Sequence, residues 1–175
     1  VSVKHDVESV RRQFKGLGRQ IDLAASRALN RAISSARTVA VRELSRSTGI
    51  RPQAAIRDRL PIKKASPNRL AAEIGVHAYT PNLARFAARQ TKSGVSAAAW
   101  GKRRIYRGTF LANQGRTVFK RVSKARLPIA PVHGPRLAKE FVDPAITRAM
   151  NKVAGERWRK ELNHELQRRA RAAHR

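Results

Sequence analysis

A stripe of small apolar side chains near the start of the chain is the feature that most limits its fold. Apolar residues recur every three or four positions from Phe14 to Leu44, and many of them are alanines. This spacing places them along one face of an α-helix. Alanine lets another backbone approach closely, so the stripe predicts a long helix that packs across a sheet or against another subunit.

The stretch VRELSRSTGIRPQAAIRDRL (residues 41–60) ends this helix and allows two interpretations. Gly49 suits a left-handed residue after the helix, and Pro52 suits the first turn of a second, short helix. The stretch also resembles a helix-turn-helix, in which three side chains would read bases: Arg51, Gln53 and Arg57. The first helix is far longer than that motif uses, so we favour a helix stop followed by a short packed helix.

The period then changes from helical to strand-like. Short runs of apolar, β-branched and aromatic residues are separated by turn residues and predict antiparallel strands: IKKAS, LAAEIGVHA, VSAAAW, KRRIYRGTFLA and TVFKRVS. Residues 80–91 predict a short irregular or helical piece anchored by Leu83 and Phe86. Residues 127–135 hold three prolines and predict an edge strand or an extended connector.

Helical periodicity returns at Pro144 and continues to Leu166. The expected fold class is therefore α+β, with a long N-terminal helix, a small antiparallel β-sheet and a long C-terminal helix. At this length we expect one domain over residues 1–175. Residues 1–13 and 168–175 are expected to be flexible arms.

Positive charge is the second strong feature of the sequence. The chain has 39 Lys and Arg against 11 Asp and Glu, a formal net charge of +28. Self-repulsion at this level predicts an anionic partner, which nucleic acid, an acidic protein surface or an anionic membrane would provide. Between Glu73 and Glu140 there is no acidic residue at all. This acid-free middle is the part expected to meet the partner.

The stretch WGKRRIYRGTF (residues 100–110) concentrates the features of a backbone-binding surface. Arginines bind phosphates, glycines permit close approach and aromatic rings stack on bases. We favour Trp100, Tyr106 and Phe110 as core residues instead, because few other aromatic residues are available to fill one. The basic side chains are a separate matter, and six of them are predicted to face DNA or another polyanion: Lys102, Arg103, Arg104, Arg107, Lys120 and Arg121.

Catalytic and metal sites find little support in the sequence. The five histidines are scattered without an HExxH motif, and the absence of cysteine removes any disulfide or thiolate site. We therefore expect no enzyme, no cofactor and no metal. No apolar run approaches the ~20 residues of a transmembrane helix, and the N-terminus lacks a hydrophobic signal core, so no membrane partner is expected.

Five blocks of the sequence, in this order, resemble the phage minor tail protein Z family, the lambda-type tail completion proteins: ALNRAISSAR, TGIRPQAAIRDRL, NLARFAARQTKSGVSAAAWGKRR, GTFLANQGRTVFKR and LPIAPVHGP. The resemblance runs from about Ala28 to the terminal helix. Its most specific part is the block from GVS to WGKR, followed by GTF and VFKR.

This resemblance implies a structural virion protein at the head-proximal end, or neck, of a long flexible tail. Such proteins complete the tail and help it join the filled head, and no enzymatic activity or cofactor comes with the family. Related neck proteins form rings, commonly hexameric, around the DNA channel. The implied partners are further copies of the chain, tail terminator or tail tube proteins, head–tail connector proteins and phage genomic DNA bound without sequence preference. Assembly would take place in the host bacterial cytoplasm.

Two alternatives stay open at this point. In the first, the basic surface meets acidic neighbouring rings instead of DNA. The protein is alternatively a free-standing DNA-binding protein, either sequence-independent or of the helix-turn-helix type.

Overall fold

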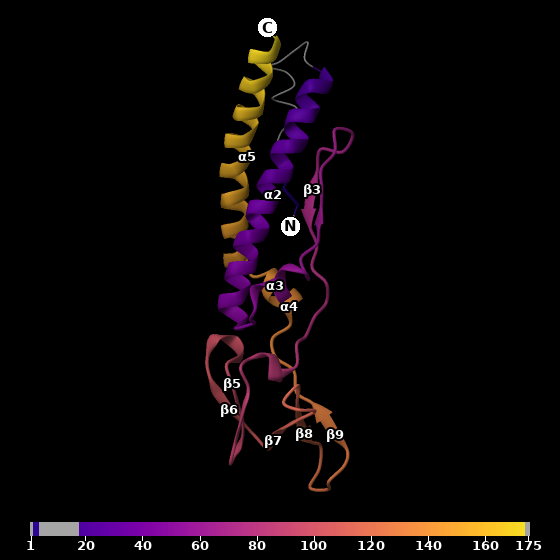
Figure 1. Cartoon of the computed structure of the whole chain (residues 1–175), viewed down its shortest axis with the longest axis vertical. Helices are drawn as coiled ribbons and strands as arrows, with labels where there is room; N and C mark the ends of the chain where they lie inside the picture. The colour runs from indigo at the N-terminus through magenta and orange to yellow at the C-terminus, as the bar shows by residue number, and fades with distance from the viewer. Residues whose placement is uncertain (1, 4–17, 174–175) are drawn as a thin grey trace. The chain divides into compact units, whose positions relative to one another are not determined.

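The computed structural model of the protein describes residues 2–3 and 18–173, and it divides into two compact units (Figure 1). Unit 1 is drawn from residues 1–40, 60–75 and 144–175, and unit 2 from residues 41–59 and 76–143. The α+β class is confirmed, with a long N-terminal helix, small antiparallel sheets and a long C-terminal helix.

Two long helices dominate unit 1. Helix α2 spans Gly18–Thr48, of which the part up to Ala40 lies in unit 1, and helix α5 spans Pro144–Ala173. The predicted start of the first helix at Phe14 lies outside the described residues. The alanine stripe is buried as the periodicity indicates, at 0–1% exposure: Ala24, Ala25, Ala28, Ala32 and Ala36.

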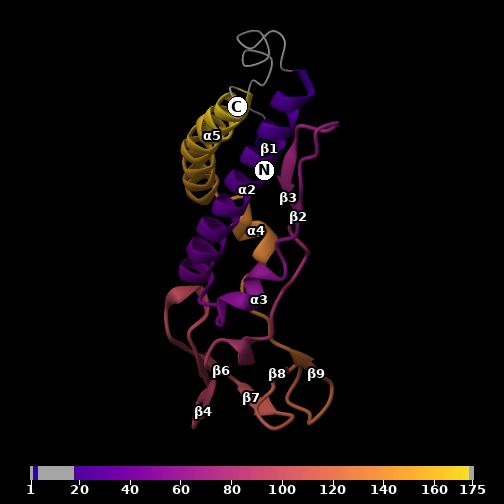
Figure 2. The same cartoon turned by 45° about the horizontal axis from the view of Figure 1, so that its top comes forward.

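Helices α2 and α5 are antiparallel. Side-chain contacts join them, among them Gln20 with Arg169, Arg27 with Glu165 and Arg31 with Glu161. The partner numbers fall along α5 as they rise along α2, so the two helices run side by side in opposite directions (Figures 1 and 2). Helix α5 contributes large side chains to the core: Ile146, Met150, Trp158 and Leu162.

A small sheet lies against α2 in unit 1. It has the order β1-β3-β2, with antiparallel pairing throughout, and its strands are Ser2–Val3 (β1), Ile62–Lys63 (β2) and Ala72–Ile74 (β3). The Asn30 side chain of α2 fixes the connection between β2 and β3. Its Nδ2 donates to the Ala65 carbonyl oxygen at 3.0 Å and its Oδ1 accepts from the Ala65 backbone N–H at 2.8 Å. One amide thereby satisfies both backbone groups of a residue that is buried.

A buried acidic pair lies on the α5 side of this helix contact. The Glu165 side chain is fully buried, and three arginines surround its carboxylate at 3.4–3.7 Å: Arg27, Arg31 and Arg168. Glu161 accepts a hydrogen bond from Arg31 and pairs with Arg157 at 2.8 Å. The hydrogen bond from Arg31 lowers the pKa of Glu161 below its ordinary value, against the opposing effect of burial. Several guanidinium groups thus offset the cost of removing two carboxylates from water.

Unit 2 contains two three-stranded antiparallel sheets. The first has the order β4-β5-β6, with bounds Arg89–Thr91, Gly94–Ala97 and Arg104–Arg107. The second has the order β7-β8-β9, with bounds Thr109–Ala112, Thr117–Arg121 and Ile129–Pro131. The proline-rich segment forms the edge strand β9, as predicted. The expectation of one strand across KRRIYRGTFLA was wrong, because Gly108 adopts a φ of +70° and divides it between the two sheets.

Side chains join the two sheets where this division occurs. The Thr109 hydroxyl, which is buried, donates to the Tyr106 carbonyl oxygen at 2.6 Å and accepts from the Val95 N–H at 3.1 Å. The Gln90 Oε1 accepts from the Leu111 N–H at 2.9 Å. Backbone groups that the break leaves without a strand partner are therefore satisfied by polar side chains.

A 3-10 turn, η1 (Leu83–Arg85), anchors the loop before the first sheet. Asn82 precedes it, and its side chain pairs with both backbone groups of Val118, at 2.8 Å and 3.2 Å. Leu83 and Phe86 are buried, which confirms them as the anchors of this segment. Gly134 lies so close to the Phe86 ring that an added Cβ would stand 2.3 Å from it.

Two short helices complete unit 2, α3 (Gln53–Arg57) and α4 (Leu137–Phe141). Helix α2 stops at Thr48, and Gly49 follows with a φ of +77°, as the sequence predicts. Helix α3 is only five residues long and buries Ile56. The favoured interpretation of residues 41–60 therefore holds, since a recognition helix needs more length to cross the major groove.

A first test concerns the ion pairs between α2 and α5. Replacing Arg31 with Met should lower the free energy of unfolding at neutral pH by about 1–2 kcal/mol, because the variant keeps two buried carboxylates with fewer cations. The folded-state pKa of Glu161 lies below its ordinary value of 4.5, so this stabilisation is present above that pH and is lost as the pH falls through the folded pKa. The difference between wild type and variant should shrink in acid, measured by urea denaturation.

Arg37→Met is the matched control, because Arg37 lies on the same helix and forms no ion pair among the described residues. Equal losses in both variants, or a difference that does not change with pH, would contradict the role given to Arg31.

A second test concerns the stop of α2. Gly49→Ala would place a Cβ 2.4 Å from the Ala98 carbonyl oxygen at a φ of +77°. Gly115→Ala meets nothing within 4 Å at a φ of +80°, so it isolates the cost of the backbone conformation. We expect a loss of about 1 kcal/mol for Gly115→Ala and of about 2–4 kcal/mol for Gly49→Ala, measured by thermal unfolding. Similar losses of unfolding free energy in the two variants would show that the backbone near Ala98 moves aside without destabilising the protein, which would contradict this prediction.

Candidate polyanion-binding surface

The first sheet of unit 2 separates its side chains into two faces. Val95 and Ala97 of β5 are fully buried and define the inner face. Successive side chains of a strand alternate between faces, so Ile105, opposite Ser96, belongs to the outer face. Arg103 and Arg107 are two residues away on either side and share that face with it. Ile105 is 54% exposed, which confirms that this face meets solvent.

A third arginine joins this face through strand pairing. Arg89 of β4 lies opposite Ser96, which in turn lies opposite Ile105. Directly paired residues of an antiparallel sheet project from the same face. We call these three exposed residues the outer arginine face: Arg89, Arg103 and Arg107.

Arg103 is held across this sheet by three hydrogen bonds. Its Nη1 donates to the Ser96 hydroxyl at 3.2 Å and to the Ser96 carbonyl oxygen at 3.4 Å, and its Nη2 donates to the Ala87 carbonyl oxygen at 3.2 Å. A guanidinium carries five N–H donors, so others stay available to a ligand. Arg103 is the best-positioned cation of this face, because part of its ordering entropy is already lost before a ligand binds.

Two of the predicted residues do not belong to the outer arginine face. Arg104 is exposed, but it lies opposite the buried Ala97 and so has the parity of the inner face. Burial raises the pKa of the neighbouring Tyr106 hydroxyl, and the charge of Arg104 acts against this shift. Lys102 is exposed just beyond the 3-10 turn η2 (Ala99–Gly101) and precedes β6.

The second sheet carries the remaining two predicted residues. Phe110 and Phe119 are paired and stacked, with ring centroids 6.2 Å apart, and the Arg121 guanidinium lies 5.9 Å from the Phe110 centroid. Arg121 therefore shares a face with two half-buried rings. Lys120 has the opposite parity, since it lies opposite the buried Thr109. The structure thus exposes all six predicted cations but does not bring them together on one face.

The expectation that the aromatic residues of WGKRRIYRGTF fill the core was wrong for Trp100, which is 48% exposed in a turn where its φ is +55°. Tyr106 and Phe110 are half-buried. The core of unit 2 is filled mainly by aliphatic side chains and by two other rings: Leu44, Ile50, Ile56, Leu83, Phe86, Val95, Val118, Leu137 and Phe141. Aliphatic residues brought in from α2, α3 and α4 fill much of this core, and Tyr106, which pairs with the buried Val95, has the parity of the inner face but is only half-buried.

Arg89 is the functional candidate that sequence reasoning missed. The segment around it predicts an irregular or helical piece, whereas residues 89–91 form strand β4. The only local signal is the turn Thr91-Lys92-Ser93-Gly94 before β5, which joins the two strands as a hairpin. Strand pairing, which the sequence does not display, decides which face Arg89 occupies.

The described residues contain no group of three or more His, Asp or Glu side chains that could hold a metal ion. None of the described helices combines the length and the apolar character needed to cross a membrane.

Comparison with models of known protein families gives a match over nearly the whole chain. The family model described as prophage minor tail protein Z matches residues 5–175, which is nearly the whole chain. No curated protein and no solved structure matches the chain significantly.

Proposed function

Because the chain belongs to the prophage minor tail protein Z family, whose members are structural proteins of phage tails, we propose that it completes the head-proximal end of a tail and helps that end join the head. As a virion component it interacts with other tail or head proteins. In the proposed arrangement, copies of the chain form a ring, hexameric by analogy with related neck proteins, around the channel through which DNA passes.

The observation that carries this proposal is the unbalanced charge of unit 2. All six strands of its two sheets lack acidic residues, and the outer arginine face presents three exposed guanidinium groups beside Ile105. Such a surface suits contact with phosphates without sequence preference.

Acidic neighbouring proteins are the competing partner for the same surface. A ring stacked on other rings meets protein as well as DNA, and exposed arginines pair equally well with carboxylates. Arg121 over the Phe110 ring resembles the Arg–aromatic contacts that are common in protein interfaces. The salt dependence of DNA binding separates the two possibilities.

A free-standing helix-turn-helix protein is the weaker alternative. Helix α3 is five residues long, and its Ile56 side chain is 0% exposed. An element of this length, with one face packed inward, offers too few side chains to read a half-site.

The third test measures how binding to duplex DNA depends on salt. We expect sequence-independent binding that weakens steeply as salt rises, through the loss of counterion release. The triple variant Arg89→Gln, Arg103→Gln, Arg107→Gln should lower the slope of log K against log salt by about one unit per lost phosphate contact, roughly three in all. Fluorescence anisotropy of a labelled duplex gives the slope, and circular dichroism checks the fold.

Lys152→Gln, Arg159→Gln, Lys160→Gln is the matched control, because it removes the same charge from exposed positions of α5. The DNA assignment of the outer arginine face is wrong if both variants flatten the slope equally. If the slope is unchanged but the face variant fails to restore infectivity, the face meets a protein partner instead.

The fourth test concerns assembly. Phage lacking this chain should produce heads and tails that do not yield infectious particles, because an unfinished tail end presents no surface for the head. Electron microscopy of the lysate should show separate filled heads and tails. Normal plaque formation would refute the tail-completion proposal, and density for this chain away from the head-proximal end in purified tails would refute the location.

A further inference from the structure

A hollow of about 310 Å³ lies in unit 2, apart from the outer arginine face. Its lining combines cationic, aromatic and apolar residues from α3, the loop before it and the segment after β3: Ile50, Arg51, Pro52, Ala55, Asp58, Arg59, His77, Tyr79 and Arg85. This volume is at the low end of the range of small-ligand pockets, which is about 300–1,000 Å³.

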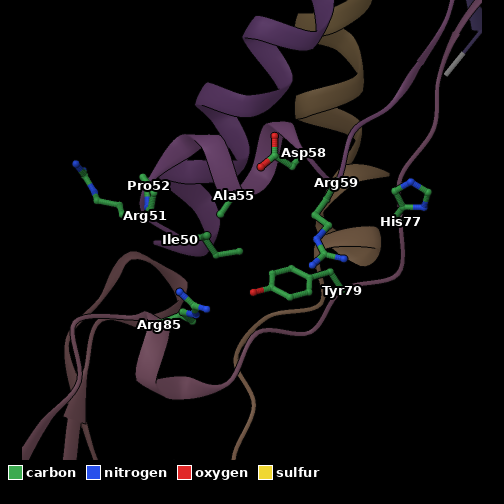
Figure 3. Close-up of a pocket in the computed structure, with 9 residues that line it drawn as sticks. All are labelled: Ile50, Arg51, Pro52, Ala55, Asp58, Arg59, His77, Tyr79 and Arg85. Carbon is green, nitrogen blue, oxygen red and sulfur yellow. The ribbon is translucent and has the colours of Figure 1, made fainter. Parts of the chain in front are cut away.

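The arginines of this hollow are not neutralised within it. Arg59 lies over the Tyr79 ring, 4.4 Å from its centroid, and this contact fixes the guanidinium without cancelling its charge. Neither the Arg51 nor the Arg85 side chain forms a hydrogen bond or an ion pair within the described part of the chain. Figure 3 shows the Arg59 and Arg85 side chains directed toward the hollow and the Tyr79 hydroxyl directed toward Arg85.

Asp58 is the one acid in the lining, and it does not fill the site. Its carboxylate points away from Arg59, Tyr79 and Arg85 in Figure 3. In Figure 3 the Tyr79 ring lies between the Arg59 and Arg85 guanidinium groups, and its hydroxyl is directed toward Arg85. An incoming anion next to Arg85 would gain a charge-assisted hydrogen bond from the guanidinium and a further one from the Tyr79 hydroxyl.

The apolar part of the lining restricts the kind of anion. Pro52 is exposed and lines the hollow on one side, and the Tyr79 ring closes another (Figure 3). A ligand therefore needs an apolar body next to its negative charge. The phosphate backbone of a duplex meets protruding basic side chains and has no apolar group to place against Pro52, so it fits the outer arginine face better than this hollow.

A second hollow adjoins the first and extends the surface. It shares Arg51 and Arg85 with the first and is lined further by Gly49, Phe86 and Ala98, among others. Trp100 is 48% exposed next to Gly101, which also lines this second hollow. Trp, Tyr and Arg are the residues that dominate binding energy in protein interfaces. Two adjoining hollows next to an exposed Trp form a longer surface than a small metabolite would cover. This favours a peptide segment as the ligand.

We propose that this hollow binds an acidic peptide segment of another protein, with one carboxylate against the Arg85 guanidinium and the Tyr79 hydroxyl and an adjacent apolar side chain against Pro52 and the Tyr79 ring. The proposal does not depend on the DNA-facing role of the outer arginine face, because the two surfaces share no residue. In the assembled tail the donor would be a neighbouring tail or head protein whose acidic segment matches the charge of this chain.

The test uses the full chain and a short probe, the blocked peptide acetyl-Phe-Glu-Glu-amide, with acetyl-Phe-Gln-Gln-amide as its uncharged control. Titration followed by NMR should give saturable shifts that cluster on the lining residues, including the Arg85 side-chain N–H and the Tyr79 backbone amide. Arg85→Gln should weaken binding about tenfold through the loss of a charge-assisted hydrogen bond. The Arg85 side chain is exposed and makes no hydrogen bond within the described residues, so the variant should fold normally.

Arg57→Gln is the matched control, because Arg57 is exposed on α3 and does not line the hollow. The proposal is overturned if no saturable shifts appear at millimolar probe, or if the uncharged peptide binds equally well. It is also overturned if Arg57→Gln weakens binding as much as Arg85→Gln, since the peptide would then be attracted by the overall positive charge and not by this hollow.

A titration with a 12-base-pair DNA duplex completes the experiment. If Arg85→Gln reduces duplex affinity as strongly as peptide affinity, the hollow is a phosphate site.

Discussion

The buried alanine face of α2 is the constraint on which the rest of the structure depends. Five alanines between residues 24 and 36 are at most 1% exposed, and larger side chains of the same helix are buried beside them: Ile21, Leu29 and Ile33. In unit 1, α5 adds further large buried side chains, and Asn30 of α2 holds the hairpin of β2 and β3. Close packing of this kind leaves little room for larger residues, because each added methylene would force an off-rotamer side chain or a backbone shift. The same helix ends just before Gly49, where an added Cβ would stand 2.4 Å from the Ala98 carbonyl oxygen. Close packing therefore also restricts the residue that follows the helix.

The distribution of the few acids explains where the excess charge is left. Glu161 and Glu165 are buried between α2 and α5, where four arginines compete for them: Arg27, Arg31, Arg157 and Arg168. These carboxylates stabilise the contact between the two helices. Because they are buried, they are not available to balance positive charge elsewhere on the surface. The sheets of unit 2 have no acids of their own, so their cations are left to water or to a partner. Repulsion among these unbalanced cations destabilises the folded chain. An anionic neighbour in the virion would relieve that repulsion.

Unit 2 offers two physically different surfaces for negative charge. The outer arginine face is a sheet surface with exposed side chains, where Arg103 is held by three hydrogen bonds and Arg89 and Arg107 are exposed. Such a surface suits a long polyanion whose charges repeat. The Arg59–Arg85 hollow is concave and partly apolar, which suits a single carboxylate attached to an apolar body (Figure 3). In the proposed position a tail protein would meet both DNA and other proteins, and the two sets of tests separate these partners.

The sequence by itself determined the helices, the stop at Gly49, the strand-rich middle and the family, because these depend on local periodicity, turn chemistry and residue order. It also located the excess charge, since charge is a property of composition. Only the tertiary structure decided which cations share a face. Arg89 joins Arg103 and Arg107 through strand pairing, and Arg104 is turned to the opposite side by the pleat. Trp100 is exposed because aliphatic residues from three helices fill the core instead, and the Arg59–Arg85 hollow exists because segments 26 residues apart in sequence meet around Tyr79. Pairing, register and packing are non-local, and a linear pattern of residue types does not contain them.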